Sequence, residues 1–280
     1  MTEKKQTQRL PGSGNSSRKK GSGRSRKPGK TAEFQILSTG LSDIGKERSR
    51  NEDRWLVDDS LRLFAVSDGM GGTSGGELAA QLVTELLPEM MQQVLRDAPH
   101  LRDDAVAKLA SGVVADLSER VKQESEGHPG FEGMGATVVL CLLRPQSATF
   151  VHLGDSRAYL YRDHQLQQLT VDHSLAQVLL DAAEISPAEF HDHPARHQLT
   201  RYVGMPGEPL PDCCVISPAA GDTLLLCSDG LTGMLNDEEI IEFLSRPEPP
   251  EVICSQLVSA ANAAGGRDNI TAVIVTLRTN

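Results

Sequence analysis

Apolar and β-branched runs, each bounded by turn-forming residues, recur along the chain between residues 34 and 277. Nine of them have the composition and length of β-strands. They are FQILST (34–39), RWLVD (54–58), RLFAVSD (62–68), GATVVLCLL (135–143), ATFVHLGD (148–155), RAYLYRD (157–163), LQQLT (166–170), DTLLLCSD (222–229) and NITAVIVTL (269–277).

Helical periodicity occurs in two blocks. Residues 75–96 and 102–125 form the first block, with Pro88 as a potential kink, and residues 237–246 and 249–266 form the second. Strands, two helices, many strands and two helices follow one another along the chain. This grouping favours an α+β domain with helices outside packed sheets over a repeated βαβ unit.

The first 31 residues differ from the rest in composition. They hold ten of the 28 Lys and Arg residues and a single acid, Glu3. Such a basic stretch without apolar anchors is predicted to be disordered, while residues 32–280 form one domain. The tail either keeps the protein in solution or contacts nucleic acid, an anionic membrane surface or an acidic partner.

Composition narrows the class of protein further. No apolar run approaches the length of about 20 residues that a membrane span needs, and the polar start does not resemble a secretion signal. The five cysteines include no C-x-x-C pair, which argues against a disulfide framework and a zinc site. We therefore expect a cytoplasmic protein.

Four aspartates stand at the ends of apolar strands. Asp68, Asp155 and Asp229 each close a predicted strand, and Asp268 lies just before one. If these ends converge, the carboxylates repel one another unless a cation lies between them. Oxygen ligands without nearby cysteine favour a hard divalent ion such as Mg²⁺ or Mn²⁺.

Other nucleotide or hydrolase motifs do not fit. GMGGTSGGE lacks the Lys-Ser/Thr of a P-loop and the spacing of G-x-G-x-x-G, and LGDSRA is not G-x-S-x-G. The stretch HDHPARH contains His191, His193 and His197. These histidines are interpreted as a solvated loop, a substrate contact or a metal site.

Six segments together resemble the metal-dependent protein phosphatases, the type 2C Ser/Thr family, in the form of its compact bacterial members. They are RSRNEDR, SDGMGG, GMGATVV, HLGDSRAYLYRD, LLLCSDGL and GRDNITAVIV, in the family's order between about residues 36 and 278. The resemblance implies a four-layer α-β-β-α sandwich with two mainly antiparallel sheets. It also implies two metal ions, Mn²⁺ or Mg²⁺, in the cleft between the sheets.

The resemblance assigns roles to the acids. Asp68 is similar to the acid that bridges both metals, and Gly69 would offer its carbonyl oxygen to the second metal. Asp229 and Asp268 resemble the remaining ligands of the first metal. Asp155, together with Asp229, matches a weaker third metal position.

The remaining site residues follow from the same resemblance. Glu52 and Asp53 would hold or orient water at the second metal, and Asn269 would support the ligands. Arg48 matches the arginine that grips the substrate phosphate. The implied reaction is hydrolysis of phosphoserine and phosphothreonine by a metal-activated water.

Residues 170–209 lie where the family carries its flap, a segment expected to move and to influence the choice of phosphoprotein. Four of its apolar residues are predicted to form a small buried face: Leu175, Val178, Leu179 and Ala182.

One feature departs from the family. Many relatives carry a histidine at the positions of Met70 or Thr73, placed to protonate the leaving oxygen, and neither residue here can do so near pH 7. The proton would then come from a coordinated water or from a flap histidine such as His193.

The resulting expectation is a monomeric phosphatase that opposes a bacterial Ser/Thr kinase. Two alternatives are a pseudophosphatase binding module, which should lack one or more of the acids, and a metal-dependent nucleotidase or nuclease.

Overall fold

The computed structural model describes residues 34–71, 75–96, 101–128, 130–131, 133–191 and 193–279. Within them, two five-stranded antiparallel sheets lie face to face. The first sheet has the order β1 (Phe34–Asp43), β12 (Ile270–Thr279), β11 (Thr223–Cys227), β8 (Arg157–Arg162) and β9 (Gln165–Gln168). The second has the order β10 (Asp212–Ile216), β7 (Ala148–Leu153), β6 (Val138–Leu143), β3 (Leu63–Ser67) and β2 (Arg54–Asp58).

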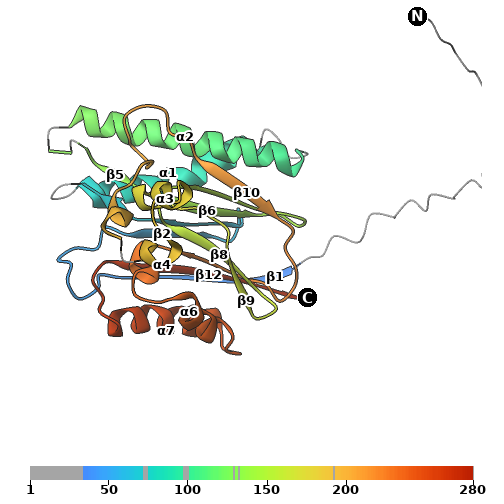
Figure 1. Ribbon diagram of the computed structural model, residues 1–280. Coiled ribbons are helices and arrows are strands. Elements are labelled where there is room, and N and C mark those ends of the chain that lie inside the picture. Colours follow the sequence, from blue (N-terminus) through green and yellow to red (C-terminus); the bar gives the residue numbers. More distant parts are fainter. Residues whose placement is uncertain are drawn as a thin grey trace, which may run out of the picture. The chain divides into compact units, whose positions relative to one another are not determined.

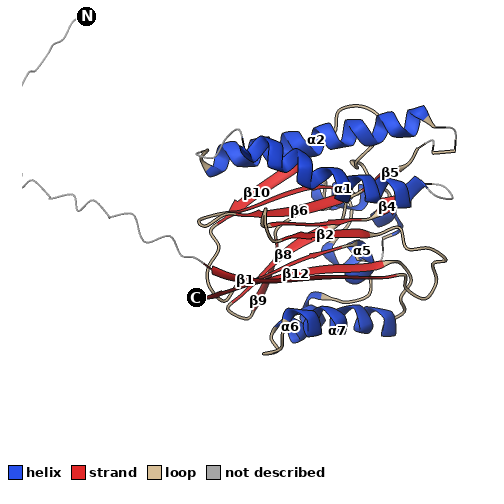
Figure 2. Ribbon diagram, turned by 180° about the vertical axis from the view of Figure 1, so that it is seen from behind, coloured by secondary structure: helices blue, strands red, loops and turns tan. Residues whose placement is uncertain are grey.

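Helices cover the outer face of each sheet. Helices α1 (Gly75–Arg96) and α2 (Asp103–Gly127) cover the second sheet, and α6 (Asp237–Leu244) and α7 (Pro250–Ala263) cover the first (Figures 1 and 2). A short pair, β4 (Gly69–Met70) with β5 (Gly135–Ala136), and the one-turn helix α5 (Asp229–Thr232) lie near the strand ends. The predicted α-β-β-α sandwich is therefore confirmed.

The central strands are apolar on both faces because each face is buried against a different layer. In β3, Leu63 and Ala65 pack toward the α1–α2 layer, whereas Phe64 and Val66 pack between the two sheets. Strand β12 repeats this division, with Ile274 toward the α6–α7 layer and its neighbours between the sheets. Side chains alternate along a strand, so an uninterrupted apolar run marks a strand covered on both sides.

Strand β10 was not among the predicted strands. It consists of Asp212–Ile216, contains two adjacent cysteines and pairs only with β7 at the edge of the second sheet. All five of its residues are half-buried or exposed, so it lacks the apolar pattern that marks the central strands.

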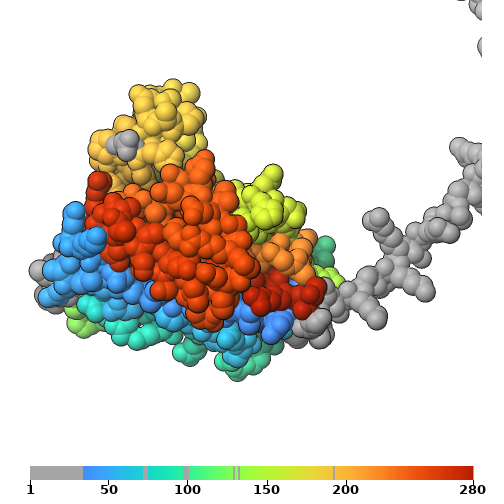
Figure 3. Space-filling model, turned by 90° about the horizontal axis from the view of Figure 1, so that it is seen from below, coloured from blue at the N-terminus to red at the C-terminus, as the bar shows by residue number. Residues whose placement is uncertain are grey.

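The flap carries three short helices: α3 (Leu175–Asp181), α4 (Pro187–Phe190) and a 3₁₀ turn at Pro194–His197. It protrudes from the body of the domain, in yellow in Figure 3. The prediction of four buried apolar residues was half wrong. Leu175 and Leu179 pack on a small core around Phe190, but Val178 is 51% exposed and Ala182 also faces solvent. The flap is too thin to bury more than one face of α3.

The predicted basic tail, residues 1–31, lies outside the described residues. Among the helices that the structure does describe, none is both long and apolar enough to span a membrane.

Candidate metal centre

Five acidic side chains meet in one cavity of about 330 Å³ at one edge of the sandwich. We call them the acid cluster: Glu52, Asp68, Asp155, Asp229 and Asp268. In antiparallel sheets, the end of one strand lies beside the start of the next. Asp68 follows β3 and Asp229 follows β11, while Glu52 and Asp268 precede strands that pair with these two. The sheet topology thus gathers acids that are far apart in sequence.

The backbone around Asp68 is held on both sides. Its N–H donates to Thr137 Oγ1 at 3.0 Å and its carbonyl accepts from the Thr137 N–H at 2.8 Å. The Thr137 hydroxyl in turn lies 2.6 Å from Ser156 Oγ. A side chain on Gly69 would collide with the carbonyl oxygen of Gly76 at the start of α1. Glycine is therefore required here because two backbone segments touch.

Asp53 is buried beside the acid cluster but does not line its cavity. Its Oδ2 accepts a hydrogen bond from Ser228 Oγ at 2.8 Å and lies 2.6 Å from Thr271 Oγ1, while its Oδ1 has no hydrogen-bond partner. Burial raises the pKa of Asp53 to about 7, although these two hydroxyls act in the opposite direction. An unpaired buried carboxylate oxygen next to other carboxylates is well suited to a cation.

Asn269 fastens the loop that precedes β2. Its Oδ1 accepts from the Glu52 N–H at 2.8 Å, and its Nδ2 donates to the carbonyls of Ile44 and Arg50 at 2.9 and 2.8 Å. The loop between these contacts carries Arg48. Asn269 therefore positions both Glu52 and Arg48 beside the acid cluster.

The electrostatics of the acid cluster also fit a cation. Burial, reinforced by the neighbouring carboxylates, raises the pKa values of Asp68 and Asp155 well above the usual range. For Asp229 burial acts in the same direction, but His197, together with Arg196 and Asp68, outweighs it and lowers the pKa of this carboxyl. The donor set is made of oxygen atoms, as Mg²⁺ and Mn²⁺ prefer. Divalent ions would offset the repulsion between carboxylates that contributes to the raised pKa values of Asp68 and Asp155.

Arg48 already places one positive charge in the cluster. Its Nη2 lies 2.6 Å from Asp268 Oδ2, and its side chain remains 53% exposed at the mouth of the cavity. The guanidinium can therefore reach both the acids and an incoming anion. The structure brings together all the predicted site residues except Asp53, which lies behind the others as a buried support.

The flap histidines divide into two positions. His191 and His193 line a neighbouring cavity of about 460 Å³, whereas His197 lines both this cavity and that of the acid cluster. His197 Nδ1 lies 3.5 Å from Asp229 Oδ2, while His193 Nδ1 accepts the N–H of Ala195. His197, not His193, is thus the flap histidine at the centre. Thr73 lies outside the described residues.

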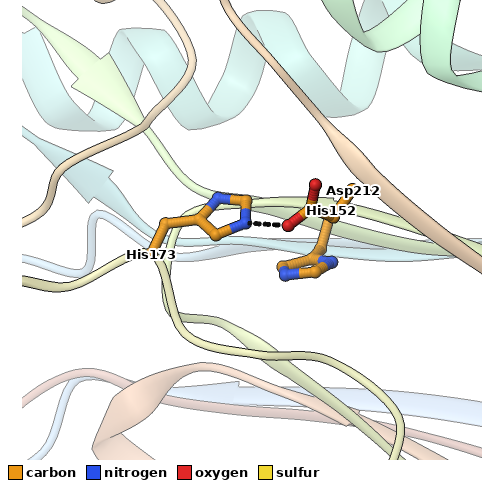
Figure 4. Close-up of side chains that lie close together, drawn as sticks. All are labelled: His152, His173 and Asp212. Carbon is orange, nitrogen blue, oxygen red and sulfur yellow. Dashed lines mark hydrogen bonds and ion pairs between the residues drawn. The ribbon is translucent and has the colours of Figure 1, made fainter. Parts of the chain in front are cut away.

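A second cluster joins the flap to the second sheet. Figure 4 shows His173 bonded to Asp212, with the ring of His152 beside them. His173 Nδ1 accepts the Gly154 N–H at 3.1 Å, so Nε2 carries the proton given to Asp212 at 3.0 Å. His152 Nε2 lies 2.8 Å from the carbonyl oxygen of Val171. The cluster therefore braces the turn that carries Asp155.

The ligand atoms of this histidine cluster lie within 4.8 Å of one another, closer than any three acids among the residues that the structure describes. Three contacts argue against a metal ion there. The two imidazoles stack with centroids 4.4 Å apart, His173 uses both ring nitrogens, and Arg201 pairs with Asp212 at 2.8 Å. We interpret it as a hydrogen-bonded brace. Sequence reasoning missed it because nothing in the chain pattern joins these three positions.

Replacing His173 by alanine is expected to destabilise the protein by on the order of 1–3 kcal/mol at pH 7, because the buried Gly154 N–H loses its acceptor. Burial lowers the pKa of His173 to about 4. The unfolded state therefore binds a proton between about pH 6.5 and 4 that the folded state does not, and this favours unfolding. The stability difference between wild type and His173→Ala should shrink as the pH falls through that window.

Urea denaturation of the metal-free protein at several pH values measures this difference. His164→Asn, an exposed change in the β8–β9 turn, is the matched control and should show no comparable trend. A difference that stays constant from pH 7 to pH 4 would contradict the neutral, doubly bonded His173.

Fold and site define a class: a two-sheet α-β-β-α protein with a carboxylate-rich candidate metal centre at one end of the sandwich. The family profile of protein phosphatase 2C matches residues 40–249, and the chain belongs to this family.

Known proteins resemble this chain in sequence and structure over most of its length. The Ser/Thr protein phosphatase PstP of Mycobacterium tuberculosis is 39% identical over 239 residues, which cover 83% of this chain and 43% of PstP. The Ser/Thr phosphatase stp of Listeria monocytogenes is 33% identical, with 84% and 93% covered. The crystal structure of the PstP catalytic domain in complex with two manganese ions superposes with a TM-score of 0.75, at 33% identity, covering 88% of this chain and all of that domain. The chain spans less than half the length of the mycobacterial PstP.

Proposed function

We propose that this chain hydrolyses phosphoserine and phosphothreonine in proteins with the help of two divalent ions held by the acid cluster. The observation that carries the proposal is the convergence of five acids on one cavity, with the pKa values of Asp68 and Asp155 raised and an unpaired carboxylate oxygen of Asp53 beside them. Family membership and the two manganese ions in the PstP catalytic domain support it.

Each acid has a proposed place. Asp68, whose pKa is raised by the other aspartates of the cavity, would be shared by the two ions, with Asp229 and Asp268 completing the ligands of the first. The carbonyl of Gly69, together with Glu52 and Asp53, would serve the second ion, directly or through water. Asp155 with Asp229 would form a weaker third position. Either Mn²⁺ or Mg²⁺ suits these oxygen ligands.

The ions, when bound, supply a water nucleophile at neutral pH and neutralise charge on the phosphate. Arg48 would hold the phosphate by two parallel hydrogen bonds from its exposed guanidinium, a geometry that lysine cannot copy. Asn269 would keep Arg48 in place by fixing the loop on both sides of it. The electrostatic stabilisation of the transferring phosphoryl group is the main catalytic contribution expected from such a site.

His197 is placed to donate a proton to the leaving oxygen. It stands on the flap at the junction of the two cavities, and its contact with Asp229 raises the pKa of the imidazole. An alkoxide of serine or threonine needs such a proton, whereas nitrophenolate leaves without one. His197 would thus compensate for Met70, which lines the acid cavity without an ionisable group.

Replacing His197 by alanine is expected to lower kcat on phosphothreonine peptides by about 10²-fold, the lower end of general-acid contributions, and to change kcat on nitrophenyl phosphate little. His193→Ala is the matched flap control. Steady-state kinetics on both substrates measure the effect. Equal losses on the two substrates would show that His197 acts by holding Asp229 or the flap.

The complete acid set argues against a pseudophosphatase. A nucleotidase or nuclease remains testable by turnover of nucleotides or DNA. A cognate bacterial Ser/Thr kinase is the proposed source of the substrates, and a monomer is the proposed state. The basic residues 1–31 are proposed to contact an acidic partner, nucleic acid or a membrane surface.

Metal depletion tests the proposed function. Protein stripped with excess chelator should show no phosphopeptide hydrolysis, and added Mn²⁺ or Mg²⁺ should restore it, because the acids alone provide no nucleophile. The measurement is phosphate release from phosphoserine and phosphothreonine peptides across a metal titration. Full activity in excess chelator would contradict the proposal.

A further inference from the structure

A second cavity of about 460 Å³ adjoins the acid cluster on the side of the flap. The two cavities share four lining residues: Arg48, His197, Asp229 and Asp268. The flap supplies one wall, and the segments around α5 and before β12 supply the other. A peptide whose phosphorylated residue reaches the acid cluster can therefore place a neighbouring side chain in this cavity, which we call the flap cavity.

Two arginines, Arg196 and Arg267, line the flap cavity, and among the described residues neither forms an ion pair with an acid, although the charge of Arg196 acts on nearby Asp229. Arg267 precedes Asp268, is exposed, and makes no hydrogen bond or ion pair within the described part of the chain. Arg196 donates one hydrogen bond to the carbonyl of His191 at 2.5 Å and lies 5.8 Å from the ring centroid of Phe190. Its remaining N–H groups have no protein acceptor among the described residues. The donors on both walls are thus available to a ligand.

These two positive charges are unusual for this domain. Residues 32–280 contain 18 basic and 37 acidic residues. Most arginines with described contacts pair with an acid, as Arg157 does with Asp172 and Arg162 with Asp222. Arg196 and Arg267 instead stand on opposite walls of a cavity beside the candidate catalytic centre.

We infer that the flap cavity is a subsite for an anionic side chain of the substrate peptide, a carboxylate or a second phosphate within a few residues of the phosphorylated one. The inference rests on the proposed function. Guanidinium groups bind both kinds of anion through charge-assisted hydrogen bonds. Met234 and Pro194 add apolar surface to the same cavity, which suits the aliphatic part of a side chain.

A panel of phosphothreonine peptides tests the subsite. The parent peptide has neutral neighbours, and its derivatives carry either glutamate or a nonhydrolysable phosphonate residue at each position from −3 to +3. At one position or more, the manganese-loaded wild type should prefer the anionic peptide in kcat/KM by roughly three- to tenfold, the range expected for a partly exposed charge pair. Raising the salt concentration should reduce the preference.

Arg267→Ala should lower this preference severalfold. The double variant Arg196→Ala with Arg267→Ala should bring the ratio of kcat/KM for the anionic peptide to kcat/KM for the neutral peptide close to one. The ratio is the readout because it does not depend on the fraction of folded, active protein. Arg246→Ala is the matched control: Arg246 bonds Gln256 and Glu242 near α6 and lines neither cavity, so the ratio should stay at the wild-type value.

Three outcomes decide the inference. A ratio lost in the double variant and kept in the control supports it, and preference for glutamate, phosphonate or both identifies the anion. No preference in the wild type, or a preference that survives in the double variant, overturns it while leaving the proposed function intact. Failure of the wild type to hydrolyse the neutral parent peptide overturns both.

Discussion

Asp68→Asn is expected to lower kcat on phosphopeptides by at least about 10³-fold, because the loss of the ligand proposed to be shared by two ions would remove several kcal/mol of transition-state stabilisation. Asp68 stands among the other acids of the cavity, and its backbone is fixed by Thr137 whatever its side chain. The loss should therefore arise from the metal centre and not from a disturbed strand end. Phosphate release at saturating Mn²⁺ measures the effect.

Stability provides an independent readout for the same variant. Burial raises the pKa of Asp68, so the charged carboxylate destabilises the metal-free fold at neutral pH, and stability should rise as the pH falls and the group becomes protonated. Without metal, Asp68→Asn should therefore unfold at a higher temperature than wild type at pH 7. Added Mn²⁺ should stabilise the wild type more than the variant.

Asp163→Asn is the matched control for this substitution. It lies exposed in the β8–β9 turn with a positive φ, which asparagine tolerates well. Wild-type turnover in Asp68→Asn, or the same response to Mn²⁺ in both variants, would contradict the assignment of Asp68.

Arg48→Ala is expected to reduce kcat/KM by about 2 kcal/mol or more, roughly 30-fold, because the guanidinium is proposed to hold the phosphate in both the bound and the transition state. Arg48→Lys should recover little of this, since an ammonium group cannot form the paired hydrogen bonds. Kinetics on a phosphopeptide and on nitrophenyl phosphate measure the effect, which should occur with both.

Lys46→Ala is the control for Arg48, because Lys46 belongs to the same loop but lines neither cavity. Unchanged kcat and KM in Arg48→Ala would show that Arg48 does not bind the substrate phosphate and only pairs with Asp268.

The sandwich could be predicted well from the sequence because the patterns that mark its strands and helices lie within short segments of the chain. Central strands such as β3 and β12 are apolar on both faces, and α1 begins and ends at the predicted residues. The ends of such strands also carry the acids, so a local pattern is enough to identify Asp68, Asp155, Asp229 and Asp268 as candidates. Antiparallel pairing then brings them together.

Long-range and edge features could not be predicted in this way. Strand β10 has one hydrogen-bonded neighbour and a weak apolar pattern. The contact between His173 and Asp212 joins positions 39 residues apart. The place of His197 beside Asp229 depends on how the flap folds against the body, and residue spacing within HDHPARH does not contain that information.

Crystals of the protein grown or soaked with Mn²⁺ test the central claim most directly, through anomalous diffraction at the manganese edge. The account predicts two strong anomalous peaks inside the acid cluster, both within ligand distance of the Asp68 carboxylate, and none between His152, His173 and Asp212. A saturated crystal with no peak at the acid cluster, or with its only peak at the histidine cluster, would contradict it.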